Sequence, residues 1–318
     1  MPNWKDVLAE IKQRQQELGP QGGSAVDLVR RKYLQELQSC TKRNVIAYYS
    51  GFLSKPEIDS GINDEDKNGF MMAVHQLDKV KGLDLILHTP GGSIAATQSI
   101  MYYLHQIFKK DIRAFVPQIA MSAGTMIACS CKEIYLARHA NLGPIDPQLR
   151  GVPARGVTLE FREACKQVRK DPGLIPVWQS IIGQYPPTFL SQCDNAWRWS
   201  NTFVREQLEE IMFEGEANAK QKARQVVRRL ADYRGNKTHD RHIHYEECET
   251  IGLKVKRIED DQSLQDLLLT VHHCFMHTLM NTSSYKIIEN HRGAAFVKQQ
   301  RSVVVPQTVL RQPVAPPR

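Results

Sequence analysis

The sequence lacks the cysteine spacing of a structural zinc site. Its seven cysteines include no pair of CxxC units, and the two nearest, Cys129 and Cys131, stand in an apolar run. Scattered cysteines of this kind are commonly small core residues of proteins from a reducing compartment. We therefore expect no metal site and thiols that stay reduced.

The start of the chain lacks a long apolar run. Asp6, Glu10 and Lys12 interrupt it, which argues against a signal peptide. Residues 114–131 carry no charge, but a proline, a glycine and polar residues break this stretch, which we interpret as a buried strand, a turn and a helix. The sequence therefore predicts a cytoplasmic protein with no transmembrane segment.

The chain has only a moderate excess of positive charge. There are 42 Lys and Arg against 34 Asp and Glu, a formal net charge of +8. No motif of aromatic and basic residues indicates nucleic-acid recognition, so no nucleic-acid partner is expected. With 318 residues and 42% hydrophobic content, the chain is long and apolar enough for a sizeable globular core.

Apolar segments of strand length alternate with helical segments in the first half of the chain. This alternation, with short connections, predicts a parallel α/β sheet with right-handed crossovers. Sites in such sheets lie at the carboxyl ends of the strands. The expected strands span 43–50, 83–87, 112–117 and 133–137, and the expected helices span 62–79, 93–109 and 122–130.

Ser122 follows one of these strands on a turn of small residues, in the pattern Ala-x-Ser-x-Gly. A serine on a sharp strand-to-helix turn exposes its hydroxyl, and the N-terminus of the following helix directs N–H groups toward it. In isolation, this window favours a serine that only caps a buried helix.

A second strand ends at a Pro-Gly-Gly turn. Gly91 and Gly92 can adopt positive φ and leave backbone N–H groups unobstructed. If both turns lie at one edge of the sheet, the N–H groups of Gly91, Gly92 and Ala123 can form an oxyanion hole beside Ser122. Most such triplets are only tight turns, so it is the pair of turns that indicates nucleophilic catalysis.

Three motifs together resemble those of the Clp-type and signal-peptide-peptidase-like serine proteases of the Clp/crotonase superfamily. They are Thr89-Pro-Gly-Gly, Met121-Ser-Ala-Gly-Thr and Ala140-Asn-Leu-Gly-Pro-Ile-Asp-Pro. Over roughly residues 44–258 the sequence is most similar to the serine dehydrogenase proteinase family. The resemblance implies a Clp/crotonase-like parallel sheet of ββα units with helical extensions at both ends. It also implies a homo-oligomeric peptidase that acts on peptide or protein substrates without a cofactor.

The resemblance leaves the general base open among several residues. Clp-type proteases use a histidine just past the next strand, but residues 141–148 contain none. The signal-peptide-peptidase-like enzymes use a lysine, and Lys166 stands where they keep theirs. A lysine must be desolvated to act as a base near neutral pH, whereas the residues around Lys166 have the pattern of an exposed helix face.

The serine dehydrogenase proteinase family is assigned the order Ser, Asp, His along the chain. Asp146 matches its acid and His239 its histidine, with His242 and His244 as alternatives. A histidine held by a carboxylate is the usual base for a serine near pH 7. Asp146 also fits an ordinary turn residue before proline, and the histidine cluster fits a surface loop.

In most segments outside the core, apolar residues recur at the spacing of a helix. Residues 1–42 predict an N-terminal helical arm, which either makes oligomer contacts or packs on its own domain. Residues 43–260 are expected to form the protease domain, in which a long helix over 187–233 covers the site or builds an oligomer interface. Residues 261–300 predict a C-terminal helical segment, and 301–318 a proline-rich flexible tail.

The sequence as a whole predicts a serine peptidase with Ser122 as its nucleophile. Two other functions stay open. A crotonase-like acyl-thioester enzyme would share the Gly-Gly turn but would give Ser122 no role. A catalytically inactive protease-fold scaffold is favoured if the His239 loop lies far from Ser122.

Overall fold

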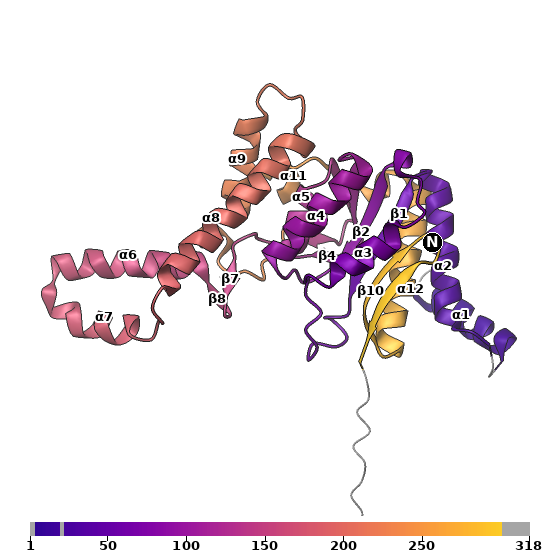
Figure 1. The fold of residues 1–318 in the computed structure, drawn as a ribbon, viewed down its shortest axis with the longest axis horizontal. Coiled ribbons are helices and arrows are strands. Elements are labelled where there is room, and N and C mark those ends of the chain that lie inside the picture. Colours follow the sequence, from indigo (N-terminus) through magenta and orange to yellow (C-terminus); the bar gives the residue numbers. More distant parts are fainter. Residues whose placement is uncertain (1–3, 20–21, 301–318) are drawn as a thin grey trace, which may run out of the picture.

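A seven-stranded sheet forms the centre of the computed structural model, which describes residues 4–19 and 22–300 (Figure 1). The strand order is β11-β10-β1-β2-β3-β5-β9. The strands are β1 (Asn44–Ser50), β2 (Leu83–His88), β3 (Ile112–Val116), β5 (Glu133–Leu136), β9 (Val255–Arg257), β10 (Ser284–Asn290) and β11 (Ala295–Gln299). β1, β2, β3, β5 and β9 pair in parallel, so the predicted parallel α/β sheet is confirmed.

Helices cover both faces of this sheet. α3 (Asp66–Val74), α4 (Ile94–Phe108) and α5 (Ala123–Cys129) lie on one face, and α2 (Ala25–Thr41) and α12 (Gln262–Asn281) on the other (Figure 1). β1 illustrates how one strand contacts helices on both faces, because its successive side chains point to opposite faces of the sheet. Tyr48 stacks on Phe70 of α3, whereas Tyr49 stacks on Phe275 of α12.

The N-terminal helices pack on the domain itself. α1 (Trp4–Leu18) buries Val7 and Ile11 in the main core, and the Trp4 ring lies 3.9 Å from the ring of His277 on α12. Residues 1–42 are expected either to make oligomer contacts or to pack on their own domain. The described part packs on α12 of the same chain.

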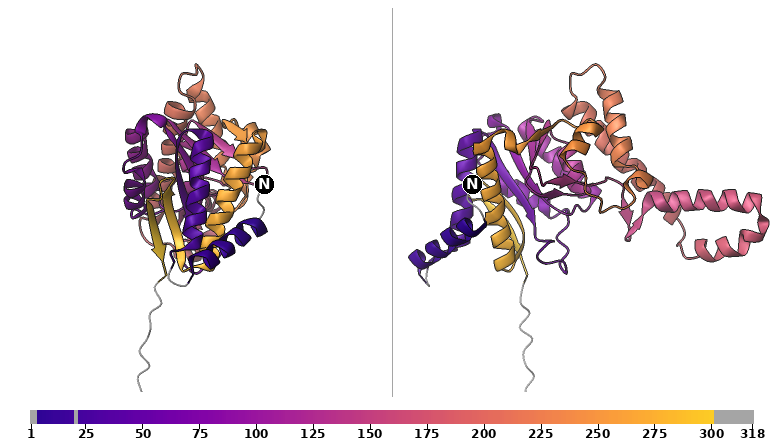
Figure 2. Two further views of the ribbon diagram at one scale, coloured as in Figure 1. Left: turned by 90° about the vertical axis from the view of Figure 1, so that its right-hand side faces the viewer. Right: turned by 180° about the vertical axis from the view of Figure 1, so that it is seen from behind.

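The crossover from β5 to β9 contains most of the remaining elements. They are β6 (Asn141–Leu142), which pairs with β4 (Ile119–Ala120), the hairpin of β7 (Gln148–Leu149) and β8 (Val152–Pro153), and the helices α6 (Ala154–Lys170), α7 (Ile175–Ile182), α8 (Phe189–Gln207), α9 (Ala219–Leu230), α10 (Tyr233–Asn236) and α11 (Tyr245–Ile251). Residues 148–193, here called the arm, project from the sheet, at the end opposite α1 (Figures 1 and 2). The arm has a small core of its own, formed by Ala154, Val157, Phe189 and Cys193.

Two helical predictions differ from the structure. The helix expected over 187–233 is interrupted by a π-helical turn (Leu208–Met212) and by Gly215, whose φ is +80°. In the segment 261–300, expected to be helical, α12 ends at Asn281 and the rest is the β10–β11 hairpin. Two residues of β10 are charged, so its sequence lacks the apolar pattern of a buried strand. In the structure both are buried and form ion pairs with other parts of the chain. The tail predicted over 301–318 lies outside the described residues.

Candidate active site

Ser122 lies on the sharp turn that joins β4 to α5. Its φ is 50° and its ψ is −114°, a conformation that non-glycine residues rarely adopt. Such a conformation costs about 1–3 kcal/mol and is found mostly at functional sites. The Thr125 hydroxyl donates to the Ala120 carbonyl at 2.8 Å and accepts from the Gly143 N–H at 2.9 Å. These hydrogen bonds hold the turn and leave Ser122 half-buried.

The turn after β2 runs directly beside Ser122. Thr89 pairs with β4, because its N–H donates to Ile119 at 3.1 Å and its carbonyl accepts from Met121 at 3.0 Å. This pairing brings Gly91 so close that a Cβ there would lie 2.7 Å from the Cβ of Ser122. The Gly-Gly turn and the serine turn therefore meet, as the sequence predicts.

Two backbone N–H groups at these turns are available to a substrate. Among the described residues, the N–H groups of Gly92 and Ala123 donate to no protein acceptor, whereas that of Gly91 donates to the Thr89 hydroxyl at 3.2 Å. Ala123 is the first residue of α5, so its N–H has no partner within the helix. Of the three predicted donors, Gly92 and Ala123 are thus free to bind an oxyanion.

His239 is hydrogen-bonded to Asp146. The distance from His239 Nδ1 to Asp146 Oδ1 is 3.0 Å. Asp146 is only 3% exposed, while the His239 side chain is 20% exposed. A carboxylate on Nδ1 leaves Nε2 of the imidazole as the proton acceptor, which is the orientation that a general base requires.

A short antiparallel bridge sets this pairing. Leu142 and Ile243 exchange two backbone hydrogen bonds of 2.9 Å each. Asp146 follows Leu142 by four residues and His239 precedes Ile243 by four, so this bridge brings the two segments that carry these side chains together. The Asn236 amide, which donates to the Leu230 carbonyl at 3.0 Å, anchors the start of the His239 loop.

Ser122 and His239 line the same cavity, whose volume is about 420 Å³. Ala196 and Trp199, one turn apart on α8, form part of its wall, and the indole N–H of Trp199 donates to Gln98 at 3.0 Å. The sequence allows α8 to cover the site but gives no signal that selects these two side chains. Other apolar lining residues are Ile94, Met126 and Leu149.

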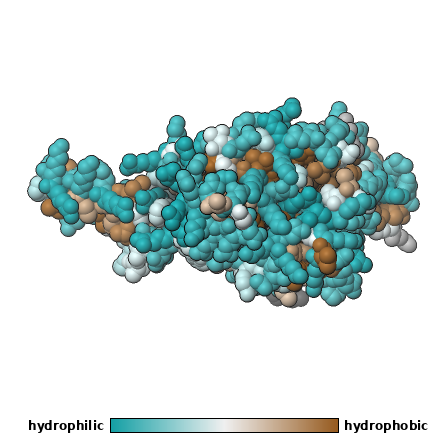
Figure 3. All heavy atoms as spheres, turned by 90° about the horizontal axis from the view of Figure 1, so that it is seen from above, coloured by the Kyte–Doolittle hydropathy of each residue, from teal (hydrophilic) through white to brown (hydrophobic). Residues whose placement is uncertain are grey.

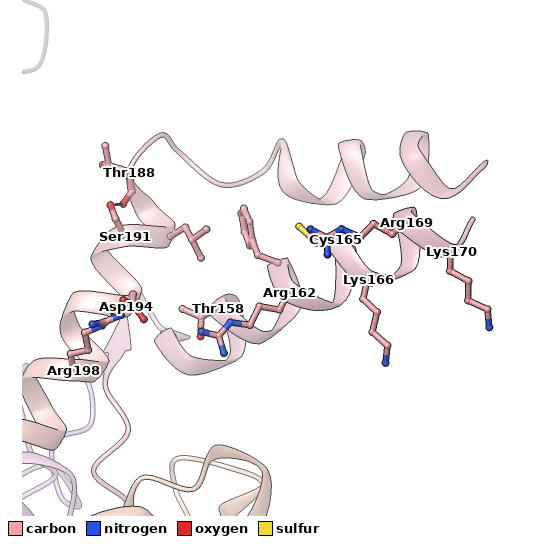
Figure 4. A pocket seen from close by; sticks show the side chains of 12 residues that line it. Thr158, Arg162, Cys165, Lys166, Arg169, Lys170, Thr188, Ser191, Asp194 and Arg198 are labelled. Carbon is pink, nitrogen blue, oxygen red and sulfur yellow. Dashed lines mark hydrogen bonds and ion pairs between the residues drawn. The ribbon is translucent and has the colours of Figure 1, made fainter. Parts of the chain in front are cut away.

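The other candidate bases lie outside this cavity. Lys166 is exposed on α6 and lines a larger groove of about 1140 Å³ on the arm, where its side chain points away from the facing helix α7 (Figure 4). His242 and His244 are exposed side chains that do not line the Ser122 cavity. Of the four candidate bases, only His239 lines the cavity that Ser122 also lines.

His88, at the end of β2, packs away from the site. Its ring lies against Tyr49 and Phe52, with centroid distances of 5.4 and 5.1 Å. Both ring nitrogens are buried and, in the parts of the chain that the structure describes, have no hydrogen-bond partner. Burial lowers the pKa of His88 to about 3, so its imidazole is neutral.

Comparisons with known proteins agree with this architecture. The sequence profile of the family described as "ClpP-like SDH-type serine proteinase" matches residues 23–178. An uncharacterized protein of Methanocaldococcus jannaschii is 30% identical over 235 residues, which are 72% of this chain and 74% of that protein. A second uncharacterized protein of the same organism is 34% identical over 93 residues, 29% of this chain and 32% of its own.

The sheet topology and the two facing turns define a ClpP-like serine proteinase fold. Within that class, the chain belongs to the SDH-type serine proteinase family. In residues 4–19 and 22–300, no helix is both long enough and apolar enough to span a membrane.

Proposed function

We propose that this protein is a serine peptidase in which Ser122 attacks the carbonyl carbon of a peptide bond. As the Ser122 Oγ–carbon bond forms, the hydroxyl proton passes to Nε2 of His239. Asp146 keeps the imidazole in the correct tautomer and stabilises the imidazolium. The N–H groups of Gly92 and Ala123 bind the oxygen on which negative charge develops.

The remaining steps use the same groups. When the carbon–nitrogen bond breaks, His239 returns its proton to the leaving amine and an acyl-enzyme remains on Ser122. Water then gives a proton to His239 as its oxygen bonds to the acyl carbon. The bond from that carbon to Ser122 Oγ breaks, His239 returns the proton to Oγ, and the carboxylic acid leaves. No step requires a metal or another cofactor.

The observation that carries this proposal is the His239–Asp146 hydrogen bond of 3.0 Å, made by a histidine that shares a cavity with Ser122. Ile94, Met126 and Trp199 give that cavity apolar walls. We therefore expect the peptidase to prefer substrates with an apolar side chain next to the cleaved bond.

Labelling with a fluorophosphonate probe tests the proposed mechanism. The wild-type protein should be labelled, whereas Ser122→Ala should not be, and His239→Ala should react at least about a hundredfold more slowly because the base is lost. Lys166→Ala and His242→Ala are matched controls that should label at the wild-type rate. Labelling of Ser122→Ala, or full labelling of His239→Ala, would contradict the assignments.

We also propose that the arm binds a second copy of this chain. No residue of α7 is buried, and its apolar side chains Ile175, Val177 and Ile181 are 45%, 55% and 37% exposed. Hydrophobic side chains interrupt the polar surface of the arm at the left of Figure 3. An exposed apolar helix on a projecting element is typical of an interface, and the superfamily resemblance makes another copy the natural partner.

A cytoplasmic location is proposed from the cysteines. All seven are free thiols, and Cys40 and Cys165 are exposed. Exposed thiols persist in a reducing compartment but oxidise outside it. Fractionation of the source cells would test this location, and recovery from an oxidising compartment would refute it.

A further inference from the structure

A second cavity, of about 580 Å³, lies between α6, α8, α9 and α10. It differs from the Ser122 cavity in its charge, because five guanidinium groups and a single carboxylate line it. These residues are Arg155, Arg205, Arg224, Arg228, Arg234 and Asp232. None of them lines the Ser122 cavity, so the proposed peptidase mechanism does not account for this concentration of positive charge.

Most of these guanidinium groups have no anionic partner. Four form no ion pair within residues 4–19 and 22–300: Arg155, Arg224, Arg228 and Arg234. Arg205 has only long contacts, 3.9 Å to Glu206 and 3.8 Å to Glu209. The Asp232 carboxylate accepts the N–H of Gly235 at 3.0 Å as the cap of α10. The positive charge in the cavity is therefore largely uncompensated.

Arg155 responds to other cations near it. Burial, followed by the charge of Arg162 and, more weakly, that of Arg234, lowers the pKa of the Arg155 guanidinium despite an opposing effect of Asp194. Arg162 lies outside the cavity, and Arg234 is the one cavity cation among these causes. An anion bound beside Arg155 and Arg234 would favour the charged form of both guanidinium groups.

The cavity also has an apolar and hydrogen-bonding side. Leu159 and Val227 line it together with Trp197, whose ring centroid lies 4.4 Å from the guanidinium carbon of Arg155. The indole nitrogen of Trp197 and the side-chain oxygen of Asn201 are buried, and neither has a hydrogen-bond partner among the described residues. These two unsatisfied polar atoms lie in the residues that form the wall of the cavity.

We propose that this cavity binds a small organic polyphosphate. Guanidinium groups bind phosphate oxygens in pairs, and several phosphates would match several arginines. The apolar wall, with the Trp197 donor and the Asn201 acceptor, suits an organic group such as a heterocycle. The volume of about 580 Å³ falls within the roughly 300–1,000 Å³ common for small-molecule sites.

The position of the cavity connects it to the candidate active site. α8 separates the two cavities, since Ala196 and Trp199 line one and Trp197 and Asn201 line the other. α10, which contributes Arg234, ends three residues before His239. A ligand that bridges α8, α9 and α10 would hold both Trp199 and the His239 loop in place. This link to activity rests on the proposed peptidase function, whereas the binding itself does not.

Calorimetric titration of the full-length protein with ATP, without divalent metal, tests the binding. We expect saturable binding that weakens with added salt. Arg224→Gln/Arg228→Gln should bind at least about tenfold more weakly, because charge-assisted contacts are lost. Arg229→Gln is the matched control, since Arg229 is exposed on the same helix but does not line the cavity, and it should bind like the wild type.

Two further titrations identify which part of the ligand the cavity recognises and whether binding depends on Ser122. Tripolyphosphate should bind more weakly than ATP, because it lacks the organic group. Ser122→Ala should bind ATP like the wild type, so a failure of the peptidase proposal leaves this result unaffected. Absence of ATP binding, or an equal loss in Arg229→Gln, would overturn the proposal. Binding of a glutamate-rich peptide but not of ATP would also overturn it, in favour of docking by an acidic protein segment.

Discussion

Two unusual backbone conformations meet at the candidate active site. Ser122 has a φ of 50° and Gly91 a φ of +103°, and their turns are in contact. Ser122 adopts a strained conformation although it has a side chain, whereas Gly91 can adopt its conformation because it has none. The packing of β4 on Thr89 imposes both conformations, so each residue depends on the other for its position.

Gly91→Ala should therefore impair both activity and stability. The new methyl group would lie 2.7 Å from the Cβ of Ser122 and would displace the serine turn. We expect labelling by the fluorophosphonate probe to be lost, and the free energy of unfolding in urea to fall by about 1–3 kcal/mol. Gly151→Ala is the control, because Gly151 also has a positive φ, +77°, but open space around it. Equal effects of the two variants would show that backbone strain alone is responsible.

His88 should make stability depend on pH. Burial lowers its pKa from 6.5 to about 3, and that of His272 on α12 well below 6.5. The unfolded chain takes up a proton below its pKa of about 6.5 while the folded chain does not, so stability should fall as the pH drops from about 6.5 toward 3. In His88→Phe, denaturation at about pH 7 and about pH 5 should show a smaller difference than in the wild type. An unchanged difference would contradict this role, and His242→Phe, at an exposed position, is the control.

Among the elements, β10 shows how buried charge can disguise a strand. Lys286 and Glu289 are fully buried, and each has a partner on a helix. Lys286 bonds to Asp66 of α3 at 2.8 Å, and Glu289 bonds to Arg31 at 2.8 Å and also to Arg30 of α2. These pairs attach helices on opposite faces of the sheet to the same strand, and they make the C-terminal hairpin part of the main domain.

Glu289→Ala should destabilise the protein strongly. It would leave the buried Arg30 guanidinium without its main anion, which typically costs about 3–5 kcal/mol. Glu10→Ala is a suitable comparison, since Glu10 also contacts a helix cation, Lys32, but is 28% exposed at its side chain, and such pairs contribute about 1 kcal/mol or less. Chemical denaturation of both variants measures the difference, and similar losses would contradict a special role for the buried pair.

At the scale of the whole molecule, the crossover between β5 and β9 contributes to three separate features. It supplies the wall of the Ser122 cavity, the arm, and the arginine-lined cavity. α8 runs through all three, from the small core of the arm at Phe189 to the active-site wall at Trp199. α8 therefore connects the arm, the second cavity and the wall of the Ser122 cavity.

Val177→Glu should disrupt assembly if the arm is the contact between copies. The wild-type protein should have a mass in solution that is a multiple of the 36.3 kDa of one chain. A charge in an apolar interface is strongly unfavourable, so the variant should shift toward the monomer in light scattering coupled to size exclusion. Val80→Glu, a substitution at a position that is 92% exposed, should not change the mass. A monomeric wild type would refute the proposal.

Local sequence was sufficient to place the two turns. Gly91, Gly92 and Ser122 each lie where an apolar strand of a parallel sheet ends, and parallel strands bring their carboxyl ends to one edge. The sheet, its helices and the meeting of the two turns could therefore be predicted. The strand β10 could not, because a buried ion pair and an exposed charge have the same sequence pattern.

The partner of Asp146 depended on contacts across the chain, because His239 is 93 residues away in sequence. The sequence shows three histidines in one loop and cannot rank them by composition. The structure distinguishes them, because His239 is the one that bonds to Asp146 and lines the Ser122 cavity. His242 and His244 flank the buried Ile243, so their side chains point to its opposite side, toward solvent. Only the tertiary structure places His239 against the carboxylate of Asp146, because the bridge brings two segments that are distant in the sequence side by side.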